Sequence, residues 1–520
     1  MKLEKYIFTT KMNNNRGYLY IQNSVYKDKG TKTKSYCIGN LSNINEIMTK
    51  LMKTSETLFL GEAILFELFN KLGMNQKLSN DMKSIGMDQS QLKILQYLIP
   101  SRILHPFSKS KLTRYIDHSF MKFTHQIDHV NDIYATMKQI KNNESYFQEH
   151  VNFMTRKLNY DYDLNYFDTT NIYFYSNKDD LRTFAYSKDG KRGLPHIAIA
   201  LACTEDRIPL YYRVYPGNTA DITCYKDYIK TKPDKRKILV FDAGCYSFEL
   251  ILLLESDEYN YKYICGADIS AYKYETDTEK IKINEQEWEI REAKYKDHRV
   301  IEAFNIEHHN QRISKIEENV ARIKEFAQTV TGESIISKRD KIYDLVASLG
   351  LKTQIKVETC EDEVELKIDE KKINELKEKA KKVILLTNLD LDNSSILKKY
   401  LGRVEVEKAF WYIKNPLSIR PVYHEKEVNI KSHVLIVLLG YLQLTILRLY
   451  VSKTYKIDLT MDKIIEDLLY SACTAIEPKK DIFMTYMGKQ VDWIKRLIID
   501  LNMPLITETI ERSVTSKKKS

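Results

Sequence analysis

The chain has 520 residues, of which 43% are hydrophobic, and this length predicts about three or four domain-sized units. Lys and Arg total 81 against 71 Asp and Glu, and residues 1–55 alone hold ten cations and three acids. This basic end indicates either binding to a phosphate backbone or a solvated surface. The seven cysteines are odd in number and lack a C-x-x-C pair, which argues against a disulfide framework and a zinc ribbon.

The first 155 residues predict a small strand module followed by helices. Strand patterns occur between Tyr18 and Tyr26 and again at 35–38, and Gly39-Asn40 forms a turn. Residues 42–155 have helical patterning, which is broken at Pro100 and Pro106. We expect these helices to bind DNA.

Residues 164–265 predict an α/β core. Strands are expected at 164–168, 196–201, 210–214, 237–242 and 261–265, and helices at 220–230 and 247–256. The order is three strands, helix, strand, helix, strand, which is the order of a ribonuclease-H-like core. The apolar run before Asp242 is typical of a buried central strand.

Residues 266–380 interrupt that core with a charged, strand-containing insertion that also holds a helical stretch near 313–328. A buried strand returns at 382–387, and helices are expected at 396–414, 432–451 and through most of 460–512. The run Val434–Leu447 is shorter than the roughly 20 residues that span a bilayer, so it predicts a buried core helix. With no apolar signal at the N-terminus, we expect a cytoplasmic protein without a membrane segment.

The resulting domain prediction has six parts. They are a basic strand-helix module (1–55), a helical DNA-binding region (56–155), the first part of the ribonuclease-H-like core (156–265), the insertion subdomain (266–380), the second part of the core (381–455), and a helical C-terminal region with a basic tail, Lys517–Lys519 (456–520).

Three acidic residues carry the predicted chemistry. Asp168 and Asp242 end predicted strands, where reacting groups collect in open α/β sheets, although a lone Asp there is often only a cap or turn former. In the helix predicted at 396–414, four residues lie within about 60° of one another around the axis. They are Tyr400, Arg403, Glu407 and Lys414. Glu405 points to the far side. The alternative is a solvated face with an Arg403–Glu407 ion pair.

This Tyr-x2-Arg-x3-Glu-x6-Lys spacing resembles the signature of bacterial insertion-sequence DDE transposases, in the family numbered four and its relatives. The segments Tyr166–Thr170, Tyr186–Gly190, Pro216–Thr219 with Asp221, Phe241–Gly244, Arg420-Pro421 and His433 are similar to other parts of the same group. The resemblance covers roughly residues 160–450.

The resemblance implies a DNA transposase, an enzyme that cleaves element ends by two-metal hydrolysis and joins the 3′-OH to target DNA, often through a hairpin. Asp168, Asp242 and Glu407 would hold two Mg²⁺ ions, which Mn²⁺ can replace, with Asp168 bridging both. Tyr400, Arg403 and Lys414 would contact the DNA end. The implied partners are terminal inverted repeats, target DNA and a second copy of the chain in a synaptic homodimer.

Other candidates are weaker. Trp288 either stacks on an unpaired base or packs in the insertion, and Lys188, Lys191 and Arg192 form a basic loop that could lie beside DNA. His308-His309 lacks a third ligand at metal spacing, and His424 and His433 are interpreted as structural. The alternative functions are a metal-dependent nuclease or integrase of the same fold and a catalytically inactive, transposase-derived DNA-binding protein.

Overall fold

The structure is a computed structural model. It describes residues 7–503 apart from 15, 28–29, 158–161, 186–189, 191–192, 270–271, 332–333, 361–362, 379, 381, 421 and 480–481. The chain forms two compact units. The first unit holds residues 1–161, 169–219 and 405–520, and the second unit holds 162–168 and 220–404. Each unit is described by itself.

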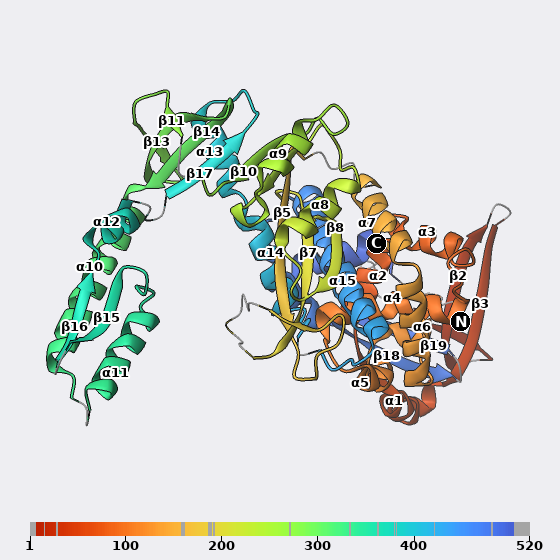
Figure 1. Cartoon of the computed structure of the whole chain (residues 1–520). Helices are drawn as coiled ribbons and strands as arrows, with labels where there is room; N and C mark the ends of the chain where they lie inside the picture. Colours follow the sequence, from red (N-terminus) through yellow and green to blue (C-terminus); the bar gives the residue numbers. More distant parts are fainter. Residues whose placement is uncertain are drawn as a thin grey trace. The chain divides into compact units, whose positions relative to one another are not determined.

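The first unit begins with an antiparallel sheet of three strands and a short helix (Figure 1). These elements are β1 (Ile7–Asn13), β2 (Arg16–Lys27), β3 (Gly30–Asn40) and α1 (Ile44–Lys53). They confirm the strands predicted in the first 40 residues, and the observed strands are longer because β2 and β3 pair along nearly their whole length.

A helical layer follows in the same unit, built around one long apolar helix. Its members are α2 (Gly61–Lys71), α3 (Met74–Asp81), α4 (Gln89–Leu104), α5 (Lys109–Tyr115), α6 (Val130–Asn142), α7 (Glu144–Lys157), α15 (Glu427–Tyr455), α16 (Met461–Leu469) and α17 (Asp492–Asp500). Helix α15 packs against α4 and α6. It is long and apolar enough to cross a membrane, but 89% of its most apolar window is buried, which confirms the predicted core helix.

The prediction of helices through most of 460–512 is partly wrong. Strands β18 (Ala472–Lys479) and β19 (Ile482–Met487) form a hairpin, and β18 also pairs with β4 (Ser55–Phe59), which was not predicted as a strand. This sheet joins segments that lie more than 400 residues apart in the chain, so local sequence patterning carried little sign of it.

The first unit also contains the second half of β5 (Leu164–Tyr173), which lies beside β7. Strands β6 (Thr183–Phe184) and β8 (Pro209–Pro216) pair antiparallel with β7 (Pro195–Cys203). Every residue of β7 is buried, as expected for a strand covered on both faces.

The second unit contains the parallel strands and their connecting helices. The first half of β5 pairs with β9 (Ile238–Phe241), and β9 pairs with β10 (Lys262–Gly266). Helices α8 (Asp221–Lys230) and α9 (Phe248–Glu255) precede and follow β9. The predicted order of three strands, helix, strand, helix, strand is therefore confirmed, with the short β6 as an addition.

The predicted insertion divides into two parts. The first adds strands to the sheet of the second unit, because β17 (Lys382–Thr387) pairs with both β10 and β14 (His298–Asn305). Beyond β14 lie β13 (Gln286–Tyr295), β12 (Glu279–Ile283) and β11 (Lys273–Tyr274). The second part has its own apolar core. It comprises α10 (Ile306–Thr329), α11 (Ile335–Ser348), β15 (Ile355–Cys360), β16 (Glu363–Ile368) and α12 (Glu370–Glu378).

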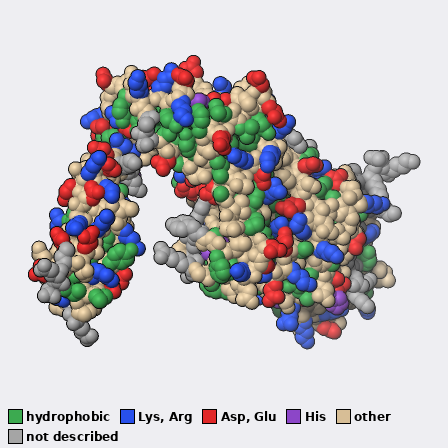
Figure 2. Space-filling view, in the orientation of Figure 1, with side chains coloured by type: hydrophobic (Ala, Val, Ile, Leu, Met, Phe, Trp, Pro, Cys, Tyr) green, Lys and Arg blue, Asp and Glu red, His purple; other side chains and the backbone are tan. Residues whose placement is uncertain are grey.

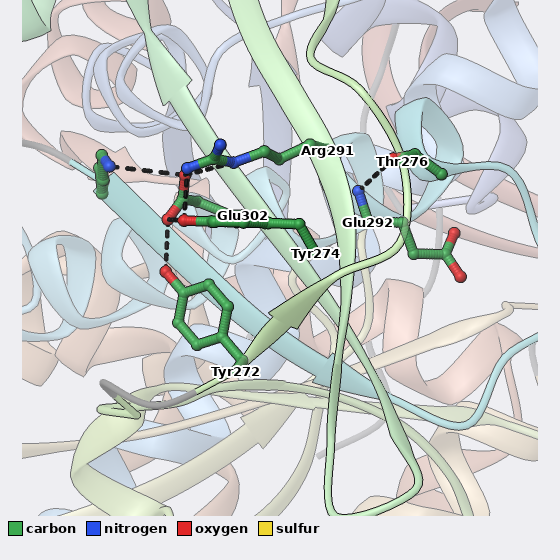
Figure 3. A network of polar contacts seen from close by, with 7 residues as sticks. Tyr272, Tyr274, Thr276, Arg291, Glu292 and Glu302 are labelled. Carbon is green, nitrogen blue, oxygen red and sulfur yellow. Dashed lines mark hydrogen bonds and ion pairs between the residues drawn. The ribbon is translucent and has the colours of Figure 1, made fainter.

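A buried carboxylate ties the added strands together (Figure 3). Glu302 of β14 is 2% exposed and pairs with Arg291 of β13 at 2.7 Å and Lys382 of β17 at 3.5 Å. Tyr272 and Tyr274 donate hydrogen bonds to the same carboxylate. Burial alone would raise the pKa of Glu302, but the bonds from Tyr272 and Arg291 and the nearby positive charges lower it. The acid is therefore held as an ion across three strands.

Candidate active site

Asp168 and Asp242 lie at matching positions on neighbouring parallel strands of the second unit. The last paired residues of β5 and β9 are Tyr166 and Val240, and each aspartate comes two residues later. The prediction that Asp168 ends its strand is wrong, because β5 continues to Tyr173. Asp168 lies instead just past the point where the pairing of β5 with β9 stops, and Asp242 lies at the matching position after β9.

The local fold fixes the Asp242 carboxylate. Its Oδ1 accepts a hydrogen bond from the Gly244 N–H at 3.1 Å, at the start of the 3₁₀ turn Ala243–Cys245. The interpretation of this residue as a cap is therefore correct for one oxygen. The other oxygen, Oδ2, lies 3.6 Å from the Arg403 guanidinium, so capping and a charged role are compatible in the same side chain.

Arg403 faces both aspartates. Its Nη1 lies 3.9 Å from Asp168 Oδ2 and 3.6 Å from Asp242 Oδ2, and the three side chains are between 14% and 30% exposed. Without a cation between them, the two carboxylates would repel each other. The guanidinium thus marks a place where positive charge is stabilised between the two acids.

The helix predicted at 396–414 is broken. Helix α13 (Asn393–Leu401) ends at Gly402, and α14 (Val404–Lys414) begins two residues later. The reason is close packing against β5. A Cβ on Gly402 would overlap the Tyr166 hydroxyl, which itself donates to the Lys399 carbonyl at 3.0 Å. Arg403 therefore lies in the turn between α13 and α14 and not on the face of a continuous helix.

Tyr400 lies beside the second aspartate, as its place in the motif suggested. A Cβ on Gly266, at the end of β10, would come within 2.6 Å of the Tyr400 hydroxyl and 3.0 Å of the Ala243 nitrogen. Gly266 thus allows this phenol to approach the Asp242 turn. Burial raises the pKa of Tyr400, and the charge of Asp242 adds to this while Arg403 opposes it, so the phenol stays protonated and can donate.

Glu407 and Lys414 lie on α14, in the part of that helix that belongs to the first unit. The Glu407 side chain is exposed. The neighbouring Glu405 pairs with Arg207 at 3.3 Å and Lys408 at 2.6 Å, in agreement with its exclusion as a candidate. The structure thus brings together Asp168, Asp242, Tyr400 and Arg403, whereas the role of Glu407 stays a prediction.

Asp221 is an acid that the sequence did not assign to the site. A Cβ on Gly244 would lie 3.2 Å from Asp221 Oδ2 and 3.2 Å from Asp242 Oδ1. Burial raises the pKa of the Cys245 thiol, and Asp242, Asp221 and Asp168 raise it further in that order. Three carboxylates therefore act on one buried thiol. The Pro-Gly-Asn-Thr segment that precedes Asp221 was the available signal, because its turn leads directly into α8.

The remaining candidates lie in different surroundings. Trp288 of β13 is 7% exposed, which favours the packed alternative over base stacking. His309 donates from Nδ1 to the Ala380 carbonyl, 2.5 Å away, and makes a structural contact. Lys188, Lys191 and Arg192 lie outside the described residues.

The donor set suits divalent metal ions, although within the described residues no group of three His, Cys, Asp or Glu side chains is close enough to enclose one. Carboxylate oxygens are the ligands that hard cations prefer. Asp168 and Asp242 already face a common positive charge, that of Arg403, and Asp221 adds a third carboxylate nearby. The residues therefore fit a metal that takes oxygen ligands.

Comparisons with known proteins identify the family. The sequence model described as "Transposase DDE domain" matches residues 160–443, which is more than half of the chain and includes all of the candidate residues above. No curated protein matches the chain. Among solved structures, it is similar to the piggyBac transposase in its synaptic complex with hairpin DNA, seen by cryo-EM. That alignment has 10% identity, a TM-score of 0.38, and covers 84% of this chain and 81% of that one. The chain belongs to the DDE transposase domain family.

Proposed function

We propose that this protein is a bacterial insertion-sequence transposase that cleaves the ends of its element and joins them to target DNA. The observation that carries the proposal is the pair Asp168–Asp242, two carboxylates that follow the paired segment of parallel strands β5 and β9 and face one guanidinium. Glu407 is proposed as the third acid on the strength of its motif spacing, within a ribonuclease-H-like core.

Asp168, Asp242 and Glu407 would hold two divalent cations, with Mg²⁺ as the natural ion and Mn²⁺ as a substitute. When bound, such a pair stabilises negative charge on both the attacking and the leaving oxygen of a phosphodiester. Asp221 is proposed as an accessory acid, because its Oδ2 and Asp242 Oδ1 would both meet a Cβ on Gly244.

The cationic side chains of this motif would position the DNA. Arg403 can form bidentate hydrogen bonds to a phosphate once the carboxylates have another counter-charge. Lys414, the last residue of α14, can contribute a point charge. Tyr400, protonated at neutral pH, can donate a hydrogen bond to a phosphate oxygen. Binding would therefore exchange the Arg403–aspartate contacts for Arg403–phosphate contacts.

The proposed reaction has two balanced steps. In the first, the oxygen of water bonds to phosphorus, the bond from phosphorus to the 3′ oxygen breaks, and that oxygen leaves as a 3′-OH. In the second, the same 3′-OH bonds to a phosphorus of target DNA and displaces a 3′ oxygen there. The second step exchanges one phosphodiester for another and requires no external energy source. A synaptic homodimer that holds two ends is part of the proposal.

An assay with purified protein tests this function. With Mg²⁺ and linear DNA that carries the element ends, we expect nicks with 3′-OH termini followed by joined products. Asp168→Asn, Asp242→Asn and Glu407→Gln should each lower cleavage by at least about a thousandfold while DNA binding is retained. Glu405→Gln, a change of the same type two residues from Glu407, is the matched control.

The other outcomes are equally informative. Cleavage without joining would support a nuclease of the same fold, and binding without cleavage in either Mg²⁺ or Mn²⁺ would support an inactive DNA-binding protein. Full cleavage by Glu407→Gln would remove that residue from the site and leave the aspartate pair in place.

A further inference from the structure

A buried group of cations in the first unit has no part in the proposed reaction. Arg102 near the end of α4 and Lys109 at the start of α5 are 6% and 5% exposed. His433 on α15 is 5% exposed, and His424 in the loop before α15 is half-buried. We call these four residues the buried cation cluster. The sequence alone indicated only structural roles for the two histidines.

The hydrogen bonds of this cluster are incomplete. Arg102 donates from Nη2 to the Ser418 carbonyl, but its Nε is buried without a partner. His433 contacts the Ile419 carbonyl through Nε2 at 3.2 Å, and its Nδ1 is likewise buried without a partner. In the part of the chain that the structure describes, neither Arg102 nor Lys109 forms an ion pair with a carboxylate.

The four side chains also disfavour one another's positive charge. Burial and then Arg102 lower the pKa of Lys109 to about 7. Burial, Lys109 and Arg102 lower the pKa of His424 to about 4, and the pKa of His433 falls well below its usual value for the same reasons. Burying a cation without a counter-charge is strongly unfavourable. A bound anion would therefore stabilise this cluster.

The cluster lies close to solvent despite its burial. Ser108 and Ser110, on either side of Lys109, are exposed, and Tyr423, next to His424, is 85% exposed. Guanidinium and ammonium groups side by side are the combination that binds phosphoryl oxygens, the first by paired hydrogen bonds and the second as a point charge.

We propose that Arg102, Lys109 and His433 form a binding site for a phosphoryl anion, separate from the acidic site. The anion would accept hydrogen bonds from Arg102 Nε and Lys109 Nζ. His433, whose Nε2–H faces the Ile419 carbonyl, would donate from Nδ1 as the imidazolium that the bound anion stabilises. A phosphate of DNA is the source that follows from the proposed function, and that choice of source rests on it. The anion site itself does not.

Thermal unfolding of the full-length protein tests the site. At equal ionic strength and pH, sodium phosphate should raise the melting temperature of the wild type more than sodium chloride does, because an anion that binds only the folded state stabilises it. Lys109→Met should melt higher than wild type in chloride, since it removes an unpaired buried charge, and should lose most of the phosphate increment. Lys138→Met, an exposed lysine on α6, is the control and should keep it.

Calorimetric titration of the wild type with inorganic phosphate gives a second reading that requires no variant. Heat of binding at one site per chain, absent in Lys109→Met and retained in Lys109→Arg, supports the proposal. An equal phosphate increment in wild type and Lys109→Met would overturn it, since phosphate also stabilises proteins through exclusion from their surface. No binding by the wild type would overturn it as well.

Binding of element-end DNA separates the two sources of the anion. If Lys109→Met weakens DNA binding about tenfold or more relative to Lys138→Met, the occupant is a DNA phosphate. Unchanged DNA binding with loss of the phosphate response identifies a free anion as the occupant. Failure of the cleavage assay would leave the phosphate titrations unaffected, so the two proposals can fail separately.

Discussion

At the scale of single residues, one arginine interacts with both aspartates of the acidic site. Arg403 lies within 4 Å of both aspartates. A guanidinium in that place competes with any metal ion that the same carboxylates bind. It also keeps two like charges from repelling each other in the free protein. The residue that would hold DNA is thus also the counter-ion of the free site.

This competition predicts the behaviour of Arg403→Ala. Without the guanidinium the two carboxylates should bind Mn²⁺ several-fold more tightly in the absence of DNA, because the ion no longer displaces a cation. Cleavage should nevertheless fall, because alanine cannot hold the phosphate. Calorimetry with Mn²⁺ and the cleavage assay measure the two effects. Arg207→Ala, which removes the partner of Glu405, is the control. Weaker Mn²⁺ binding by Arg403→Ala would contradict this account.

At the scale of elements, the break between α13 and α14 positions Arg403. It occurs because Gly402 packs directly on the Tyr166 hydroxyl of β5. The sequence could show the helical composition of 396–414 but not this contact, because Tyr166 and Gly402 are far apart in the chain. The prediction of one continuous helix face was therefore wrong, although the residues chosen from it, Tyr400 and Arg403, do lie by the aspartates.

The packing of Gly402 gives a test of this element. Gly402→Ala should lower the free energy of unfolding by about 1–3 kcal/mol, as overpacking does, because its Cβ would overlap the Tyr166 hydroxyl. Tyr166→Phe removes that oxygen, so the alanine should be less destabilising in a Tyr166→Phe background. Denaturant unfolding of the four proteins gives the coupling free energy. Additive effects would mean that the two residues do not constrain each other.

At the scale of the whole molecule, charge is concentrated locally although the total is modest. Figure 2 shows Lys and Arg interspersed with Asp and Glu over the visible face. The N-terminal module differs, because Lys11, Lys34, Lys50 and Lys53 are all exposed on β1, β3 and α1. This module is the proposed phosphate-backbone surface of the protein.

Replacement of Lys11, Lys34, Lys50 and Lys53 by Gln should weaken DNA binding and flatten its dependence on salt. For every phosphate that the protein no longer neutralises, the slope of log K against log salt should become shallower by about 0.9. Fluorescence anisotropy between low and high salt measures the slope. Four exposed lysines of the second unit, Lys280, Lys282, Lys315 and Lys367, form the control set. An unchanged slope would place the main DNA surface elsewhere.

The sequence predicted most of the helices and strands but few of the contacts between them. Apolar runs such as Leu239–Phe241 revealed buried strands, because burial on both faces leaves a mark within a few residues. The β4–β18 pairing and the continuation of β5 past Asp168 left no such mark. Both depend on contacts between distant segments.

The pairing of β4 with β18 affects how the protein is made. Residues 55–59 leave the ribosome long before residues 472–476 exist, so β4 must wait for its partner with an open edge. Helix α15, which α4 and α6 pack against, is also synthesised late. The amino-terminal helices therefore cannot reach their final packing during most of translation, and messages that end early should yield chains prone to aggregation and degradation.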